Sequence, residues 1–201
     1  EIKECDWSSD VCSSDLIADM TVMGYQAGYT NTTGAHLTAF GVNALRASNA
    51  NDNAAFGYAA GYATSSGSGN AFFSNYAGYS NTTGGNNTAI GYTALFSNTT
   101  ASNNTAVGYQ AGYSNTTGAG NTYIGHTAGY YQANTGSPYN TALGIQALYG
   151  SAGASGYSNT AIGSFALQVT SSGAQNTALG TSALASNTTA SYNTEIGRAH
   201  V

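Results

Sequence analysis

Residues 104–120 read NTAVGYQAGYSNTTGAG, and variants of this 17-residue unit fill most of the chain. Aligned on NTAxG, the copies start at residues 20, 37, 53, 70, 87, 104, 121, 140, 159, 176 and 193. Their spacing is 17 residues, apart from one of 16 and two of 19. Because a fixed period of this length is the signature of repeat architectures, it is the main evidence on the fold. We number the positions of the unit 1 to 17 and call residues that share a position a column.

Column 4 always holds a sizeable apolar residue, and we predict that it forms the core. Its residues are Met23, Phe40, Phe56, Phe73, Ile90, Val107, Ile124, Leu143, Ile162 and Leu179. Column 8 is alanine in every complete copy, which predicts that other groups pass close to it. Its residues are Ala27, Ala44, Ala60, Ala77, Ala94, Ala111, Ala128, Ala147, Ala166 and Ala183. One apolar residue and one alanine per coil make a thin interior, so we expect the small-residue face to pack against other chains.

The remaining columns predict a parallel β-solenoid. Column 1 is Asn in nine of eleven copies and column 2 is usually Thr, as expected if amides and hydroxyls stack from coil to coil. Two short extended segments, NTAxG and the stretch around xALY, alternate with turns rich in Gly, Asn and Thr. At about 4.8 Å per coil, ten coils make an all-β rod about 48 Å long. Disorder is the main alternative, although the low net charge and constant register argue against it.

The two ends differ from the repeats. The last seven residues can be encoded GAG ATC GGA AGA GCA CAC GTC, whose reverse complement translates as DVCSSDL, the sequence of residues 10–16. Both ends resemble translated sequencing adaptor. We therefore interpret residues 1–16 and 195–201 as artefacts and residues 17–194 as one repeat domain.

The composition argues against several function classes. Only 5% of the 201 residues are charged and three are Lys or Arg, too few to neutralise a run of phosphates, so no nucleic-acid partner is expected. No stretch approaches the roughly 20 apolar residues of a membrane span, and we expect no membrane contact by this segment. His36 and His126 lie at least five coils apart without catalytic partners, while Arg46 and Asp52 fit a surface pair. We expect no enzyme, metal or cofactor.

Two columns of tyrosine are the candidate binding surface, because aromatic rings with a polar tip suit protein or glycan ligands. The alternative is that stacked tyrosines only stabilise neighbouring coils or lie between chains. The column 6 candidates are Tyr25, Tyr58, Tyr92 and Tyr109, and the column 10 candidates are Tyr29, Tyr62, Tyr79, Tyr113, Tyr130 and Tyr149.

The segments NTAIGYTAL (87–95), NTAVGYQAG (104–112) and NTALGTSAL (176–184) resemble the head repeats of YadA-like trimeric autotransporter adhesins over about residues 20–194. The resemblance implies a left-handed parallel β-roll, a homotrimer, and display on a bacterial cell surface. It also implies a function in attachment to host molecules, cells or surfaces through a protein or glycan ligand. Related repeats occur in phage tail-fibre-like proteins, so a structural spacer of a virion is the alternative. An ice-binding solenoid is a third hypothesis, suggested by the Thr-Thr turns.

Overall fold

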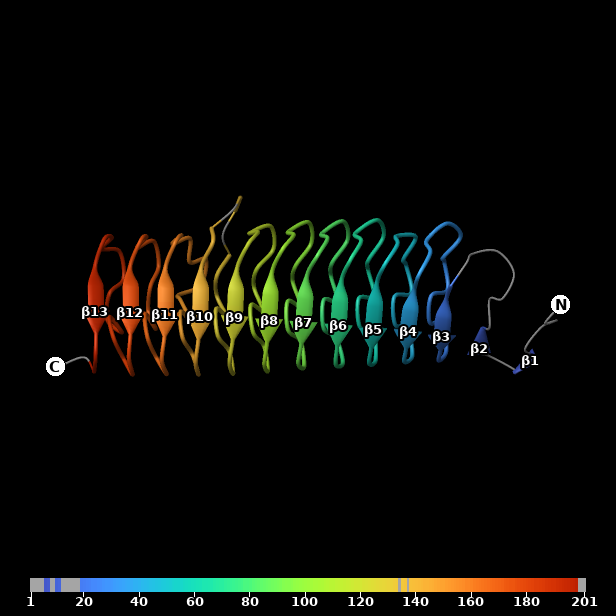
Figure 1. Ribbon diagram of the computed structural model, residues 1–201, viewed down its shortest axis with the longest axis horizontal. Helices are drawn as coiled ribbons and strands as arrows, with labels where there is room; N and C mark the ends of the chain where they lie inside the picture. The colour runs from blue at the N-terminus through green and yellow to red at the C-terminus, as the bar shows by residue number, and fades with distance from the viewer. Residues whose placement is uncertain (1–5, 8–9, 12–18, 134, 137, 199–201) are drawn as a thin grey trace.

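The computed structural model describes residues 6–7, 10–11, 19–133, 135–136 and 138–198, and these residues contain strands and turns but no helix. Eleven three-residue strands form one parallel sheet in which each strand pairs with the next along the chain (Figure 1). They are β3 (Thr21–Met23), β4 (Thr38–Phe40), β5 (Ala54–Phe56), β6 (Ala71–Phe73), β7 (Thr88–Ile90), β8 (Thr105–Val107), β9 (Thr122–Ile124), β10 (Thr141–Leu143), β11 (Thr160–Ile162), β12 (Thr177–Leu179) and β13 (Thr194–Ile196). A separate antiparallel pair joins β1 (Asp6–Trp7) to β2 (Asp10–Val11).

The predicted β-solenoid is confirmed, with one strand in each coil and matching columns in register. In β7 and β8, for example, Ile90 pairs with Val107. The prediction of a second extended segment, around xALY, is wrong. Columns 7 and 9 have left-handed backbone, as at Thr93 (φ 53°) and Leu95 (φ 49°), so this part of the coil is a series of turns. It still bonds coil to coil, because the Leu95 N–H donates to the Ala111 carbonyl at 3.0 Å.

The stacking of column 1 amides is also confirmed. From Asn70 to Asn193, each backbone N–H in the column donates to the side-chain oxygen of the asparagine one coil earlier, at 2.9–3.0 Å, so that Asn53 is the first acceptor of the row. Several of the side-chain amides also donate to turn carbonyls, such as Asn87 to Ala101 at 2.8 Å. The interior therefore contains a continuous row of hydrogen-bonded asparagines, which satisfies polar groups that burial would otherwise leave unpaired.

The prediction that column 4 forms the core is wrong, because the side chains of this column point outward. Six of its residues, Met23, Phe56, Phe73, Ile90, Leu143 and Leu179, are 37–68% exposed, and the other four are half-buried. Successive side chains of a strand point to opposite sides, so the buried asparagine of column 1 places column 3 inside and columns 2 and 4 outside. Column 3 is accordingly buried in β4 to β12 and is mostly alanine.

Large side chains from column 3 or from column 9 fill the interior, and where one of these columns holds a large residue the other holds a small one. Phe72 and Tyr123 occupy column 3 where column 9 is glycine, whereas Leu95 and Leu148 occupy column 9 where column 3 is alanine. A Cβ built at Gly61 would lie 2.6 Å from Cδ2 of Phe72, and one at Gly78 would overlap the same ring. Each large ring thus takes the space that leucines fill in other coils.

The alanines of column 8 belong to this interior. All ten are at most 2% exposed, which confirms that other groups pass close to them. The expectation that they pack against other chains is wrong, because side chains buried within one chain present no surface to a second one. A thin core is stable here because backbone hydrogen bonds link each coil to its neighbours around much of its perimeter.

Glycine is required in column 5, where the chain leaves the strand. Gly108 has φ 131°, and a Cβ there would lie 2.5 Å from the Gly125 carbonyl oxygen in the next coil. Ser74 is the exception, with φ 128°. The coils can therefore stack closely only because this corner has no side chain in nearly every copy.

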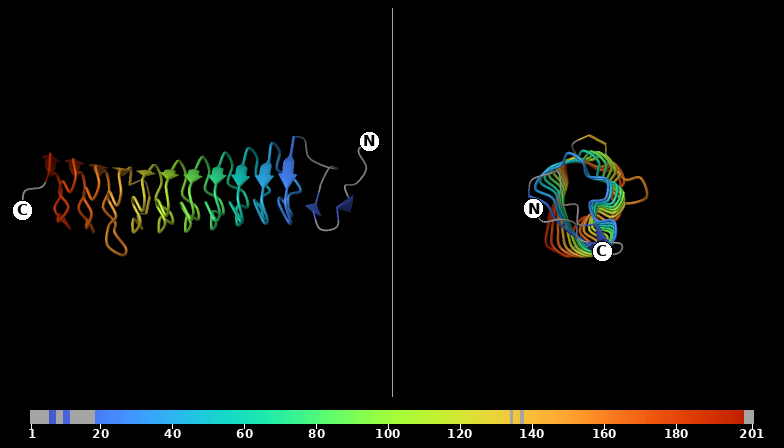
Figure 2. Two further views of the ribbon diagram at one scale, coloured as in Figure 1. Left: turned by 90° about the horizontal axis from the view of Figure 1, so that it is seen from below. Right: turned by 90° about the vertical axis from the view of Figure 1, so that its right-hand side faces the viewer.

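The two 19-residue copies place their extra residues at the turn end, as predicted, and the two longer turns stand out from the end-on outline (Figure 2). These turns contact each other. Gln132 and Ala154 form an isolated parallel bridge, the Ala133 N–H donates to the Ala154 carbonyl at 3.0 Å, and the Ser158 N–H donates to the Pro138 carbonyl at 2.6 Å.

The predicted artefact at the C-terminus does not coincide with a structural boundary. Strand β13 crosses position 194/195, and the Glu195 carboxylate accepts a hydrogen bond from the Leu184 N–H at 2.7 Å. The adaptor interpretation of both ends stays a prediction, and most of residues 1–16, including Cys5 and Cys12, lie outside the described residues.

Candidate functional site

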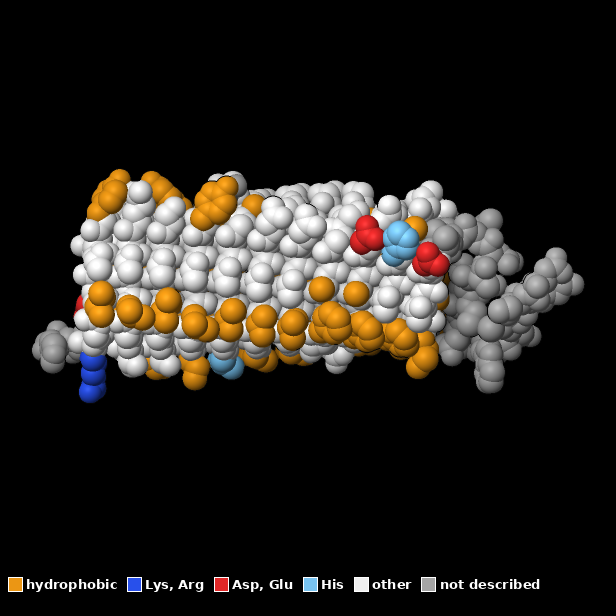
Figure 3. Space-filling view, in the orientation of Figure 1, with side chains coloured by type: hydrophobic (Ala, Val, Ile, Leu, Met, Phe, Trp, Pro, Cys, Tyr) orange, Lys and Arg blue, Asp and Glu red, His pale blue; other side chains and the backbone are white. Residues whose placement is uncertain are grey.

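A row of apolar side chains runs along the outer face of the sheet. We call the ten column 4 residues, from Met23 to Leu179, the apolar stripe. In the space-filling view it runs along the sheet from β3 to the last strands (Figure 3). At one end Phe40, Phe56 and Phe73 stack with ring centroids 5.1 and 4.8 Å apart. Monomeric proteins rarely expose so long an apolar surface, so the stripe is a candidate contact face.

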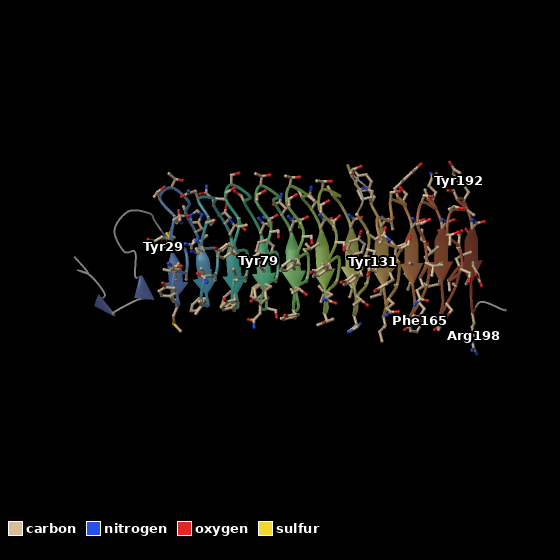
Figure 4. All side chains as sticks on the ribbon, turned by 180° about the vertical axis from the view of Figure 1, so that it is seen from behind. Tyr29, Tyr79, Tyr131, Phe165, Tyr192 and Arg198 are labelled. Carbon is tan, nitrogen blue, oxygen red and sulfur yellow. The ribbon has the colours of Figure 1, made fainter. Side chains whose placement is uncertain are left out.

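The column 10 tyrosines form the ladder expected from the sequence. Its rungs are Tyr62, Tyr79, Phe96, Tyr113, Tyr130 and Tyr149, with consecutive centroids 5.0–5.3 Å apart and rings within 16° of parallel. We call these six residues the aromatic ladder. Phe96 was not among the sequence candidates, although its column could have identified it. In Figure 4, Tyr29, Tyr79 and Tyr131 are spread along the length of the rod at about the same height.

Arg46 continues the aromatic ladder towards the N-terminus. Its guanidinium carbon lies 5.6 Å from the ring centroids of both Tyr29 and Tyr62. Its side chain also donates to the Gln26 amide oxygen at 2.9 Å and to the Tyr62 hydroxyl at 3.2 Å. The predicted pairing of Arg46 with Asp52 is therefore wrong, because the cation is held between two aromatic rings instead.

The column 6 candidates are less continuous. Tyr92, Tyr109 and His126 stack at 5.8 and 5.0 Å. Between Tyr58 and Tyr92 the column holds Asn75, and the neighbouring Tyr76 makes edge contacts with both tyrosines, at 5.2 and 6.1 Å. Tyr25 is exposed at the N-terminal end of this column.

The stacking limits what these tyrosines can bind. Within the aromatic ladder most ring faces are covered by the rings one coil above and below, so a ligand meets ring edges and hydroxyls. Burial, and after it the neighbouring tyrosines, raises the pKa of Tyr130 and Tyr149 in the aromatic ladder and of Tyr76 beside column 6. The geometry favours the alternative interpretation, in which stacked tyrosines stabilise neighbouring coils.

All the acidic and basic side chains of residues 17–194, and one of the two histidines, lie near the N-terminal end of the rod. His36 Nδ1 lies 2.8 Å from an Asp52 carboxylate oxygen, and His36 Nε2 lies 3.7 Å from Asp19 (Figure 3, pale blue between red). All three side chains are more than half exposed, so this contact contributes little to stability. His126, on the other hand, stacks against Tyr109 and is not brought near His36.

The structure brings together no nucleophile, base and orienting group from these residues. Within the described residues, no group of three or more His, Cys, Asp or Glu side chains is arranged to hold a metal ion. In the same part of the chain, no helix has the length and apolar character of a membrane span. The Thr-Thr turns also serve the fold, since the hydroxyls of Thr82 and Thr99 donate to carbonyls of the next coil.

Comparisons with family models, with curated proteins and with solved structures gave no match to this chain. The architecture is therefore established by the structure itself. The resemblance of the repeats to YadA-like adhesin heads stays a prediction.

Proposed function

We propose that this chain is a non-enzymatic segment of a surface adhesin, a rigid rod that assembles as a homotrimer and mediates attachment at a bacterial cell surface. The apolar stripe is the observation that carries the assembly. It lies on the outer face of the sheet in consecutive coils, where water would otherwise contact apolar residues along the whole rod. Burying it between parallel chains removes that surface from water at about 25 cal/mol per Å².

The stripe suits association of identical rods better than association with an unrelated globular partner. Each coil contributes an outward apolar residue at the same position, so identical chains can contact one another coil by coil. Residues 53–194 contain no Asp, Glu, Lys or Arg, and no charge in this part opposes close approach of the chains. The number three and the adhesive function come from the resemblance to YadA-like heads.

A structural spacer of a phage tail-fibre-like protein is the second candidate. It is favoured by the regularity of the rod, because ten strand spacings of about 4.8 Å supply length with little change in surface from coil to coil. This function needs the same lateral assembly but no ligand site along the repeats.

Light scattering of the whole chain, with circular dichroism on the same sample, tests the assembly. We expect a β-rich particle of about three times the 20.2 kDa of one chain. Replacing two stripe residues, Ile90→Asn with Leu143→Asn, should give β-rich monomers. The matched control places asparagine at two exposed turn positions, Thr83→Asn with Thr100→Asn, and should keep the mass of the parent. A folded monomer of the parent chain at micromolar concentration contradicts the proposal.

A further inference from the structure

The edge of the rod formed by the last two residues of each copy has an unusual sequence in the last coils. Here lie Tyr139, Tyr157, Gln175 and Tyr192, which we call the tyrosine edge. Backbone hydrogen bonds between successive coils hold it together: the Ser158 N–H donates to the Pro138 carbonyl at 2.6 Å, that of Gln175 to Tyr157 at 2.9 Å and that of Tyr192 to Ala174 at 3.1 Å. The four side chains therefore lie on consecutive coils of one rigid surface.

The backbone at this position favours other residues. The last residue of each complete copy has left-handed backbone, with φ 50° at Tyr139 and 63° at Tyr192. In other coils the position is held by residues that tolerate this conformation well, such as Gly69, Asn86 and Gly120. A bulky aromatic residue there is conformationally unfavourable, so the two tyrosines are not explained by the needs of the local backbone.

Packing does not explain them either. Tyr139, Tyr157 and Tyr192 are 64%, 52% and 78% exposed, more than the ladder tyrosines, and none of them contacts another aromatic ring among the described residues. The ring of Tyr139 lies beside Gly120, where a Cβ would be 2.7 Å from its Cδ1, so glycine at position 120 leaves the room that this ring occupies. Tyr192 stands at the upper edge in Figure 4, away from the level of Tyr79 and Tyr131. These rings have faces that a ligand can reach.

We propose that the tyrosine edge binds a neutral oligosaccharide lying along the rod. This inference rests on the proposed adhesive function and adds the ligand class and the site. Aromatic faces pack against the C–H surfaces of sugar rings, while the Gln175 amide and the tyrosine hydroxyls can bond sugar hydroxyls. Tyr139 and Tyr192 are three coils apart, about 14 Å, which matches an extended saccharide of about three units.

The chemistry of the edge distinguishes this ligand from two others. An acidic glycan needs cationic partners, and residues 53–194 contain no Lys or Arg. A stable protein partner needs about 800 Å² on each side, and a single row of four side chains is much smaller than that. The apolar stripe lies on a separate part of the surface (Figure 3), so the edge stays accessible when the stripe is covered.

Isothermal titration of the whole chain with cellotetraose, mannotetraose and chitotetraose tests the site, with sialyllactose and a heparin tetrasaccharide as acidic probes. We expect at least one neutral probe to bind, with an affinity that does not change between 50 and 500 mM salt. Tyr139→Ala and Tyr192→Ala should each weaken binding at least tenfold, while Tyr139→Phe should weaken it less than threefold. Tyr131→Ala is the matched control and should bind as the parent does, because this ring packs edge-on against Tyr130 and Tyr149, outside the tyrosine edge.

Several results would overturn the inference. They are no binding of any neutral probe to the folded chain, binding of the acidic probes alone, and equal binding by the parent and Tyr139→Ala. Circular dichroism of each variant checks that the β-structure is intact. Light scattering of the same samples reports the assembly separately, so a trimer without saccharide binding refutes this site, while a monomer refutes the proposed assembly.

Discussion

Replacement of Phe72 by alanine should be among the most destabilising single changes in the rod. Phe72 is fully buried, and its ring fills the space beside Gly61 and Gly78 in two adjacent coils. Phe→Ala in a protein core costs about 3–5 kcal/mol in the free energy of unfolding, depending on how far the surroundings collapse. Collapse is restricted here because backbone hydrogen bonds fix the coil spacing, as from the Gly78 N–H to the Ala94 carbonyl at 2.9 Å. We therefore expect about 4–5 kcal/mol.

The neighbouring residue is a matched control. Phe73 has the same side chain on the next position of β6, but it points outward and stacks on Phe56 at 4.8 Å. Within one chain, Phe73→Ala should remove only that stacking and some partly buried area, about 0.5–1.5 kcal/mol. Because Phe73 belongs to the apolar stripe, both variants are compared in the Ile90→Asn, Leu143→Asn background, in which the chains are expected to be monomeric. Urea unfolding followed by circular dichroism, at one fixed protein concentration, measures both variants.

A second substitution tests the reason for the loss. Leucine already occupies column 9 with left-handed backbone at Leu95 (φ 49°) and Leu167 (φ 48°), where column 3 is alanine. Gly78→Leu alone should destabilise the rod, because its side chain would overlap the Phe72 ring. In the Phe72→Ala background the same change should stabilise it, with a coupling free energy of about 2–3 kcal/mol. If Gly78→Leu destabilises both backgrounds equally, the exchange of volume between columns 3 and 9 is refuted.

Three further predictions use the same unfolding assay. Ser74→Gly should raise the free energy of unfolding by about 1–2 kcal/mol, since φ 128° is strained for serine; no gain would contradict this. Tyr123→Phe should be neutral or stabilising, because the Asn140 side chain lies near the buried hydroxyl but makes no hydrogen bond of good geometry with it; a loss above about 1 kcal/mol would contradict this. Stability should fall as the pH rises above about 10, because tyrosines whose folded-state pKa is raised keep protons that the unfolded chain releases. Tyrosinate absorbance measured against pH, together with the free energy of unfolding at each pH, checks this prediction. A free energy of unfolding that stays constant above a pH of about 10 would refute it. The groups are Tyr76, Tyr123, Tyr130 and Tyr149.

Much of the architecture could be predicted because a solenoid repeats one local solution. The 17-residue period predicts the coils, the NTAxG segments become β3 to β13, and the longer copies extend the turns. The constant asparagine of column 1 predicts stacked amides, and the row from Asn53 to Asn193 has that geometry. These features depend on residues that repeat, so the column itself carries the information.

The side of the strand that faces inward could not be read from hydrophobicity. In TAV or TAI the larger apolar residue is the usual choice for a core, yet this interior is narrow enough to be filled mainly by alanine and asparagine. A better signal lies in the exceptions. Phe72 and Tyr123 occur only with glycine in column 9 of their own and the preceding coil, which makes sense if columns 3 and 9 touch. The sequence predicts the stacked tyrosines of the aromatic ladder. It does not show that neighbouring rings cover their faces, because this depends on the spacing of the coils and on the orientation of the rings.

Because adjacent side chains of a strand point to opposite sides, neighbouring residues serve different purposes, one in folding and the next in the proposed association of chains. Columns 1 and 3 supply hydrogen bonds and close packing inside one chain, whereas column 4 places apolar area outside, as the contrast between Phe72 and Phe73 shows. In an ordinary domain one substitution in a strand changes both the core and the surface it supports. Here Phe72→Ala should lower the free energy of unfolding without changing any residue of the stripe, while asparagine at stripe positions should dissociate the chains without unfolding them. That separation is a direct consequence of the period-two geometry of a three-residue strand.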